Sequence, residues 1–248
     1  MIFVLTGAGI SRESGLDTFR DKDGLWSKVN IEDVATPRAF KKDPVRVLEF
    51  YDFRRKELLS GDIKPNPAHQ ALARLESQIS NYRAEKGLKK PGLFLVTQNV
   101  DDLHERGGSK QVCHTHGSLL WAKCQACDHK FKWLKNLSLE EVCPKCQAQG
   151  QLRPDVVWFE EMPYHLEEIE TNLKNCHLFV SIGTSGLVYP AASYLRVAKK
   201  LKVPTLEINI APTGSANLYD RGFYGPASEA VPQWVDEVIS QLNLWVFN

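Results

Sequence analysis

Four cysteines constrain the fold of this 248-residue chain more than any other feature of its sequence. They form two Cys-x-x-Cys pairs, Cys124 with Cys127 and Cys143 with Cys146, and fifteen residues separate the pairs. Four thiolates at this spacing can surround one tetrahedral Zn²⁺, and they leave no open position for a catalytic water. A disulfide framework or a redox-active Cys-x-x-Cys is the alternative, but the latter needs only one pair. The spacing therefore favours a structural zinc site on a small lobe.

The composition and charge exclude several classes of protein. Hydrophobic residues make up 43% and charged residues 25%, which is typical of a soluble globular protein. The formal net charge is only +1, whereas proteins that bind nucleic acid through phosphate contacts carry a basic excess. The longest apolar runs are far shorter than the ~18 residues of a membrane-spanning helix, and no secretory signal pattern is present. We therefore expect a cytoplasmic protein that binds no specific nucleic acid and no membrane.

Four short apolar runs predict buried strands, and small or polar residues follow each of them. The runs are 2–5, 93–97, 178–182 and 205–208. In open parallel sheets, ligands bind at the carboxyl ends of the strands. The pattern therefore predicts an α/β protein with a Rossmann-like, doubly wound parallel sheet and one ligand site along that edge.

Helical patterns and the cysteine ribbon interrupt this sheet. Amphipathic spacing predicts helices over 44–59, 68–79 and 233–244, and residues 30–70 hold no convincing strand. We expect a large domain and a small domain with two segments. The large domain comprises 1–30, 80–117 and 158–248, the helical insertion of the small domain comprises 31–79, and its zinc ribbon comprises 118–157.

A glycine-rich loop follows the first expected strand. Gly7 and Gly9 permit a tight turn and a close approach of the backbone to a pyrophosphate at a helix N-terminus. Arg12 stands where the motif G-x-G-x-x-G has its third glycine, and the acidic residue that binds ribose after a second strand has no counterpart. The loop indicates nucleotide binding, with a plain tight turn as the alternative, and it disfavours an ordinary hydride-transferring dehydrogenase.

Seven blocks of sequence, in the same order, resemble the signature motifs of the sirtuins. The opening block comprises 7–11, 15–20 and 23–26, and the later blocks are 97–104, 116–117, the two cysteine pairs, 183–185, Asn209 and 224–228. The resemblance covers essentially the whole chain. Sirtuins are NAD-dependent protein lysine deacylases with a Rossmann-type large domain and a small zinc lobe, so the resemblance implies that activity here. NAD would then be a co-substrate rather than a redox carrier.

The resemblance also implies a role for each site residue. His116, rather than His114, would be the general base, although two histidines this close are also compatible with a metal site or a core. The catalytic set is His116, Asn99 and Asp101. The NAD-binding set is Gly7, Ala8, Gly9, Ser11, Thr18, Phe19, Arg20, Trp26, Gln98, Asn99, Asp101, Gly183, Thr184, Ser185, Asn209 and Ala227. The expected products are free lysine, nicotinamide and O-acyl-ADP-ribose.

Tyr51 and Arg54 resemble the Tyr-x-x-Arg motif of the sirtuin branch that removes acidic acyl groups. At i and i+3 their side chains lie on one face of a helix, and a phenol beside a guanidinium can bind a carboxylate. A packed tyrosine beside a solvated arginine is the alternative. The resemblance thus implies a desuccinylase, demalonylase and deacetylase that acts on acylated lysine side chains of proteins.

Two other functions remain open on the sequence. A protein mono-ADP-ribosyltransferase would use the same NAD site, and a zinc-ribbon interaction module would need no catalysis. The chain also departs from the family pattern in one of the matching blocks. Residues 15–20 read Gly-Leu-Asp-Thr-Phe-Arg, where most deacetylases of the family read Gly-Ile-Pro-Asp-Phe-Arg.

Overall fold

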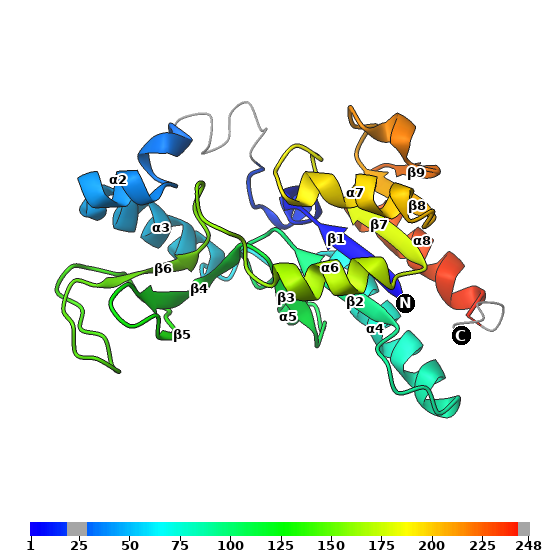
Figure 1. Cartoon of the computed structure of the whole chain (residues 1–248), viewed down its shortest axis with the longest axis horizontal. Helices are drawn as coiled ribbons and strands as arrows, with labels where there is room; N and C mark the ends of the chain where they lie inside the picture. The colour runs from blue at the N-terminus through cyan, green and yellow to red at the C-terminus, as the bar shows by residue number, and fades with distance from the viewer. Residues whose placement is uncertain (19–28, 243–248) are drawn as a thin grey trace.

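The computed structural model describes residues 1–18 and 29–242 and shows two parts side by side (Figure 1). The larger part is built on a parallel six-stranded sheet, and the smaller part combines helices with a three-stranded sheet. Among the described residues, no helix is both long enough and apolar enough to cross a membrane.

The large sheet has the strand order β3-β2-β1-β7-β8-β9, and every neighbouring pair is parallel. Its strands are β1 (Ile2–Thr6), β2 (Leu93–Thr97), β3 (Val112–His114), β7 (Leu178–Ile182), β8 (Thr205–Asn209) and β9 (Arg221–Tyr224). The chain winds outward from β1 in one direction and then from β7 in the other. This is the order of a dinucleotide-binding sheet, in which the ligand crevice opens where the winding reverses.

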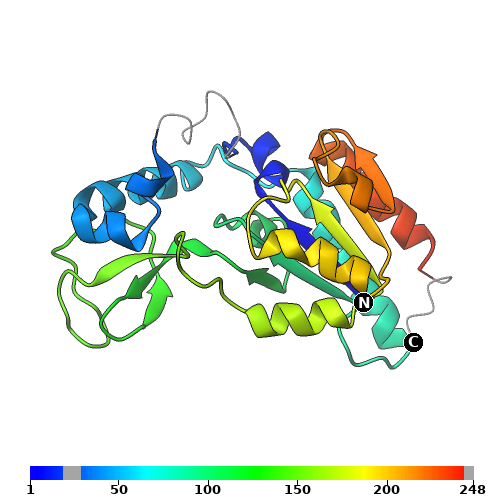
Figure 2. The ribbon, with the colours of Figure 1, turned by 45° about the horizontal axis from the view of Figure 1, so that its top comes forward.

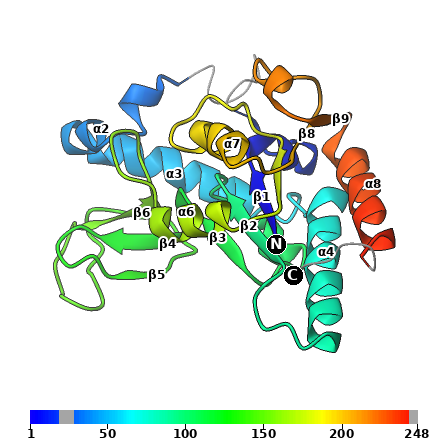
Figure 3. The ribbon, with the colours of Figure 1, turned by 45° about the vertical axis from the view of Figure 1, so that its right-hand side comes forward.

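Helices cover both faces of the large sheet (Figure 2). On one face, α4 (Pro67–Glu85) and α8 (Ala227–Ser240) lie side by side and pack on Ile2 and Val4 of β1 (Figure 3). On the other face, α6 (Leu166–Lys174) and α7 (Ala191–Lys200) pack on Phe3 and Leu5. Successive side chains of a strand point to opposite faces, so a strand buried on both faces must be apolar throughout. This explains why β1 has no polar residue before Thr6.

The small part has its own core, formed by segments far apart in the chain. It contains α2 (Pro37–Lys42), α3 (Pro44–Leu58) and the antiparallel strands β4 (Gly117–Cys124), β5 (Lys130–Lys132) and β6 (Leu152–Val156), in the order β5-β4-β6. Val47 and Leu48 of α3 share a buried cluster with Leu119 of β4. Short helices lie in the connections of both parts. In the large part, η1 (Ala8–Ile10) and η2 (Arg12–Ser14) follow β1, α5 (Leu103–Arg106) lies between β2 and β3, and η4 (Ala216–Leu218) lies between β8 and β9. In the chain, η3 (Ile31–Asp33) precedes α2.

A buried ion pair fastens α3 to the zinc ribbon. Asp52 and Arg55, one turn apart on α3, bind each other, and both are buried. The Asp52 carboxylate also accepts the Leu137 N–H at 2.9 and 3.0 Å, and Arg55 Nε donates to the Leu119 carbonyl at 2.9 Å. Removing one member of such a pair leaves a buried charge uncompensated. Because the pair also binds backbone groups of Leu137 and Leu119, the orientation of α3 depends on the ribbon.

The structure confirms the predicted doubly wound fold and differs from the predicted boundary at residue 79. The four expected strands appear within one residue of their predicted ends, and α3 matches the helix expected at 44–59. However, the buried face of α4 packs in the core of the large sheet rather than in the insertion expected at 31–79. An apolar helix face shows that a partner exists, but not which one.

Candidate active site and zinc centre

A cavity lies where loops at the carboxyl edge of the large sheet face α3 of the small part. It encloses about 850 Å³, open solvent at its mouth included. Residues after β1, β2 and β3 line one side, and residues of α3 and the segment after β6 line the other. The lining residues are Ala8, Ser11, Leu16, Asp17, Ala35, Tyr51, Arg54, Leu58, Gln98, Asn99, Val100, Asp101, His116, Leu119, Val156, Val157 and Phe159.

The glycine loop closes the sheet edge at the point where the winding reverses. Gly7 N–H donates to the Ile182 carbonyl at 3.0 Å, and Gly9 N–H donates to the Gly183 carbonyl at 2.9 Å. A Cβ on Gly9 would lie 2.7 Å from the Gly183 Cα, which no side chain tolerates. The two glycines therefore let the loops after β1 and β7 touch, and they form one continuous edge for a ligand.

Three polar side chains form a buried network beside this loop. Ser11 Oγ donates to Asp101 Oδ2 at 3.0 Å and lies 3.1 Å from Asn99 Nδ2, which donates to it. Burial raises the pKa of Asp101, and the hydrogen bonds from the Leu103 N–H and the Ser11 hydroxyl oppose that rise. Asn99 and Asp101 therefore face the cavity in fixed orientations, as expected for residues that hold a polar ligand group.

His116 lines the cavity, and within the part of the chain that the structure describes only one of its ring nitrogens has a hydrogen-bond partner. Its Nδ1 lies 3.0 Å from the Gln98 carbonyl oxygen, and since a carbonyl only accepts, Nδ1 must carry the hydrogen. In the neutral ring the lone pair is then on Nε2. Burial lowers the pKa of His116, and the hydrogen bond to Gln98 partly opposes this. A neutral imidazole with Nε2 available is what a general base requires.

His114 has both ring nitrogens engaged and does not line the cavity. Nδ1 contacts the Asn99 carbonyl at 3.2 Å, and Nε2 contacts Glu105 Oε1 at 2.7 Å. Burial acts to lower the pKa of His114, but the hydrogen bond and charge of Glu105 outweigh it and raise the pKa. Both partners are acceptors, so His114 has no lone pair to offer, and the geometry supports His116 as the base.

The lowered pKa of His116 predicts the pH dependence of catalysis. The neutral form is the active one, so activity should be lost only as the pH falls through the lowered pKa. We expect the acid limb of kcat/KM to have its midpoint below about pH 6.5, the ordinary histidine value. The profile of kcat/KM for an acylated peptide measures it, and the residual activity of His116→Ala should lack this limb. A midpoint above about pH 7 would contradict the assignment.

The expected NAD-binding residues that follow β7 and β8 or begin α8 lie along the same sheet edge, outside the cavity. Asn209 ends β8 and donates from Nδ2 to the Thr184 carbonyl at 2.9 Å, which joins the loops after β7 and β8. Ser185 follows in the β7 loop, Gly183 has a left-handed φ of 60°, and Ala227 begins α8. Thr18 is half-buried but does not line the cavity, and Phe19, Arg20 and Trp26 lie outside the described residues.

Tyr51 and Arg54 both line the cavity from α3. The Tyr51 side chain is only 3% exposed and its ring packs against Trp158 and Phe50. Burial raises the pKa of Tyr51 to about 12, so the phenol keeps its hydrogen at neutral pH. Burial lowers the pKa of Arg54, and the charges of neighbouring acidic groups oppose this, so a guanidinium remains positively charged beside the phenol.

Asp17 lines this cavity as well, and the sequence analysis did not place it there. Its negative charge acts on Arg54 and opposes the lowering of the Arg54 pKa by burial. Asp17 stands in the 15–20 segment, where the chain departs from the family pattern, so the departure was the available signal. The cavity therefore contains a carboxylate as well as a guanidinium.

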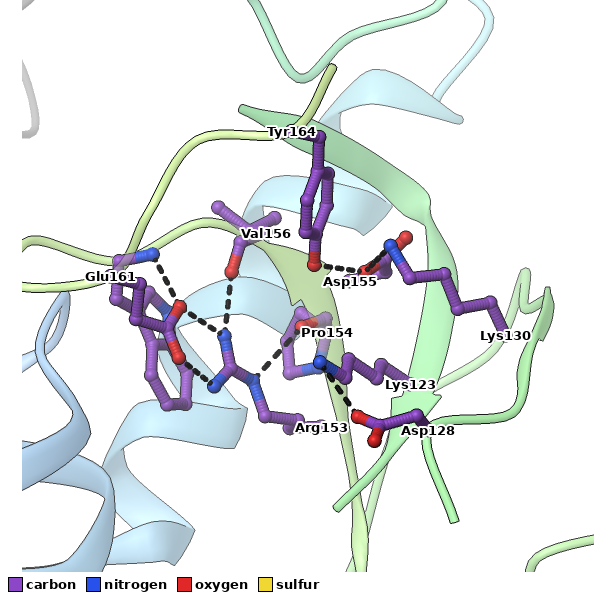
Figure 4. A network of polar contacts seen from close by, with 10 residues as sticks. Lys123, Asp128, Lys130, Arg153, Pro154, Asp155, Val156, Glu161 and Tyr164 are labelled. Atoms are coloured by element: carbon purple, nitrogen blue, oxygen red, sulfur yellow. Dashed lines mark hydrogen bonds and ion pairs between the residues drawn. The ribbon is translucent and has the colours of Figure 1, made fainter. Parts of the chain in front are cut away.

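Arg153 holds the cavity wall that follows β6 (Figure 4). Its guanidinium binds both carboxylate oxygens of Glu161, at 2.6 and 2.8 Å, donates to the Val156 carbonyl at 2.7 Å and stacks 3.5 Å from the Trp158 ring centre. Glu161 also accepts the Trp158 N–H at 2.9 Å. This bidentate pair fixes the segment from which Val157 and Phe159 reach the cavity. The apolar run Val-Val-Trp-Phe gave no signal in the sequence that would distinguish this wall from ordinary core.

A second contact in Figure 4 anchors the same segment. Tyr164 OH donates to Asp155 Oδ1 at 2.7 Å, and Lys130 Nζ lies 3.0 Å from that oxygen. The ammonium of Lys130 also lies 3.4 Å from the Tyr164 ring centre. These contacts connect the zinc ribbon with the segment that returns to the large sheet.

The four paired cysteines meet in one cluster, as the spacing predicts. Their sulfur atoms all lie within 4.8 Å of one another, with Cys124 to Cys146 at 3.7 Å and Cys127 to Cys143 at 3.8 Å. A tetrahedral ion with Zn–S bonds of about 2.3 Å requires sulfur separations of about 3.8 Å, so the cluster fits Zn²⁺. In each pair, the first cysteine's carbonyl accepts the N–H of the residue four positions on, which gives two matching turns.

The fold and site together define a class: a nucleotide-binding α/β protein with a four-thiolate metal lobe and a histidine in the cavity at the sheet edge. The sequence profile of the Sir2 family matches residues 7–190. The chain therefore belongs to the Sir2 family, the sirtuins, as the sequence motifs indicated.

Relatives and solved structures agree with this assignment. The chain is 48% identical to the NAD-dependent protein deacylase SIR2rp3 of Leishmania major over 97% of this chain and 96% of that protein. It is 49% identical to the NAD-dependent protein deacylase of Bdellovibrio bacteriovorus over 96% of each. A Sir2 homologue mutant in complex with ADP-ribose superposes with a TM-score of 0.83 at 37% identity, covering 99% of this chain and 94% of that one. A Sir2 homologue in complex with NAD superposes with a TM-score of 0.81 at 38% identity, covering 97% of this chain and 90% of that one.

Proposed function

We propose that this chain is an NAD-dependent protein lysine deacylase that removes succinyl and malonyl groups as well as acetyl groups. The names of relatives near 48% identity support NAD-dependent protein deacylation, and complexes of Sir2 homologues with ADP-ribose and NAD support NAD as the co-substrate. One observation carries the finer part of the proposal. Tyr51, Arg54 and His116 line a single cavity, so a charged acyl group and the base can meet there.

The residues of the chain divide the work between NAD and the acyl-lysine. When bound, NAD supplies the nicotinamide leaving group and the ribose that receives the acyl group. The sheet edge from Gly7 to Asn209 holds the dinucleotide, and the buried Asn99 and Asp101 hold the polar end of the nicotinamide. The Nε2 atom of His116 accepts a proton from a ribose hydroxyl. The hydrogen on Nδ1 does not take part, because it stays hydrogen-bonded to the Gln98 carbonyl oxygen.

The residues on the α3 side of the cavity recognise the acyl group. The neutral Tyr51 phenol donates one hydrogen bond, and the Arg54 guanidinium supplies a charge-assisted pair to a distal carboxylate. Asp17 shares this cavity and reduces the net positive charge that such a carboxylate meets. A pocket with this balance of positive and negative charge accepts uncharged acetyl groups as well as charged succinyl and malonyl groups.

Replacing Arg54 by methionine should raise the Michaelis constant for succinyl-lysine while leaving acetyl-lysine almost unchanged, because acetyl presents no charge to α3. A partly buried charged hydrogen bond contributes about 1.5–3 kcal/mol, so the loss in kcat/KM should be on the order of 10- to 150-fold. Tyr51→Phe should act in the same direction but more weakly, since it removes one neutral donor. The ratio of kcat/KM values for the two peptides measures both effects. Equal losses on both peptides would withdraw the acidic-acyl assignment but leave the deacylase activity in place.

Proteins are the substrates that the relatives' names support, and a complex of a Sir2 protein with a deacetylated p53 peptide agrees with this. We propose acylated lysine side chains as the recognised group, with no specific nucleic acid. A cytoplasmic location is part of the proposal, because the four-thiolate site requires reduced cysteines. Mono-ADP-ribosylation of protein is the second candidate from the sequence, and the relatives' names do not favour it.

A further inference from the structure

A second group of metal-ligand atoms lies apart from the four cysteines. The thiol of Cys113, the ring of His165 and the carboxylate of Glu168 each offer one ligand atom, and these atoms lie within 4.8 Å of one another. His165 Nδ1 and Glu168 Oε2 are 3.6 Å apart. The cluster belongs neither to the cavity that holds His116 nor to the zinc ribbon.

The fold brings the three residues together through the backbone beside them. Tyr164 N–H donates to the Thr115 carbonyl at 2.9 Å, and Thr115 Oγ1 donates to the Tyr164 carbonyl at 3.3 Å. These bonds hold the segment before α6 against the end of β3 (Figure 3). His165 has a left-handed φ of 62°, and Glu168 lies three residues on, in the first turn of α6. Both side chains therefore lie on the side of α6 that faces Cys113.

The three proposed ligands differ in their surroundings. Cys113 is half-buried and packs against the core cluster that contains Phe3 and Tyr194, whereas His165 and Glu168 are exposed. The cluster is therefore anchored in the core of the large domain on one side and reachable from solvent on the other.

We propose that Cys113, His165 and Glu168 form a second metal site, which binds a divalent transition-metal ion of the Zn²⁺ class. Sulfur, imidazole nitrogen and carboxylate oxygen are the ligands that zinc accepts, and three protein ligands leave the fourth position to water. Binding forms an S–metal bond as the Cys113 thiol releases its proton to solvent. Since His165 and Glu168 are exposed, the site opens to solvent.

Metal counting on the full-length protein tests the site. Protein purified without added metal should contain one zinc per chain, and equilibration with Zn²⁺ followed by removal of unbound metal should give two. Cys113→Ala should bring the second value back to one. Cys176→Ala is the matched control, because it removes a buried thiol of the same core cluster and should leave two.

Two surface substitutions keep the test independent of folding. Glu168→Gln and His165→Asn each remove one ligand, and asparagine tolerates the left-handed backbone at 165. Loss of an outer partner of a metal ligand costs about 10- to 100-fold in affinity, so losing a ligand should weaken Zn²⁺ binding at least as much in calorimetry. Binding should also release protons in the wild type and fewer in Cys113→Ala. A wild type that never exceeds one zinc, or a second zinc that survives in all three variants, would overturn the proposal.

Discussion

Replacing His116 by alanine is expected to reduce kcat for deacylation by roughly 10²-fold or more, the usual contribution of a positioned general base. The substitution removes Nε2, the nitrogen whose lone pair faces the cavity, while Asn99 and Asp101 keep their network with Ser11. NAD affinity should therefore remain close to that of the wild type. Steady-state kinetics with an acylated peptide and direct titration with NAD measure the two quantities.

His114→Ala is the matched control, since His114 lies two residues away but donates from both nitrogens. It should retain most of the activity. If His114→Ala were inactive and His116→Ala nearly normal, the base would be the other histidine.

Replacing Cys143 by serine is expected to remove the structural zinc and to unfold the small lobe. Cys143 is fully buried and belongs to the core that the ribbon shares with α3. Metal binding provides about 10 kcal/mol or more of folding free energy in small zinc modules, and no disulfide replaces it here. Because Asp52 and Arg55 bind the ribbon, α3 and its Tyr51 should lose order together with it.

Zinc analysis of protein purified without added metal, together with amide hydrogen exchange, measures this outcome. Exchange should accelerate in β4, β6 and α3, while the core of the large sheet stays protected. Cys176→Ser is the control, since it alters a buried thiol of the large sheet. Retention of one zinc per chain with full activity in Cys143→Ser would contradict a structural role.

The sequence predicted those parts of the fold whose pattern is local. Buried strands such as β1 and β7 are continuous apolar runs, and the polar residues after them indicated the ligand edge. β3 and β9 went unpredicted, because each is a short edge strand without a fully buried run. The partner of α4 also depends on tertiary packing, which its own sequence does not specify.

The candidate site also contains residues that a local sequence pattern indicates and residues that only tertiary packing brings into place. His116 follows the unpredicted β3, and its role came from the resemblance to the family. Residues that follow a predicted strand, such as Asn99, carry a local signal because polar groups there are unusual in a packed sheet. The cavity wall from Val156 to Phe159 does not, since its apolar residues read as ordinary core. The pair of Arg153 and Glu161 that shapes this wall forms only when the chain returns from the zinc ribbon.

Incubation of the wild-type protein with NAD and matched acetyl-, malonyl- and succinyl-lysine peptides tests the central claim most directly, with the products identified by mass spectrometry. For each peptide we predict that deacylated peptide, nicotinamide and O-acyl-ADP-ribose form in a 1:1:1 ratio. We predict no reaction when NAD is omitted. Transfer of ADP-ribose to protein without deacylation, or peptides left intact while NAD is unconsumed, would contradict an NAD-dependent deacylase.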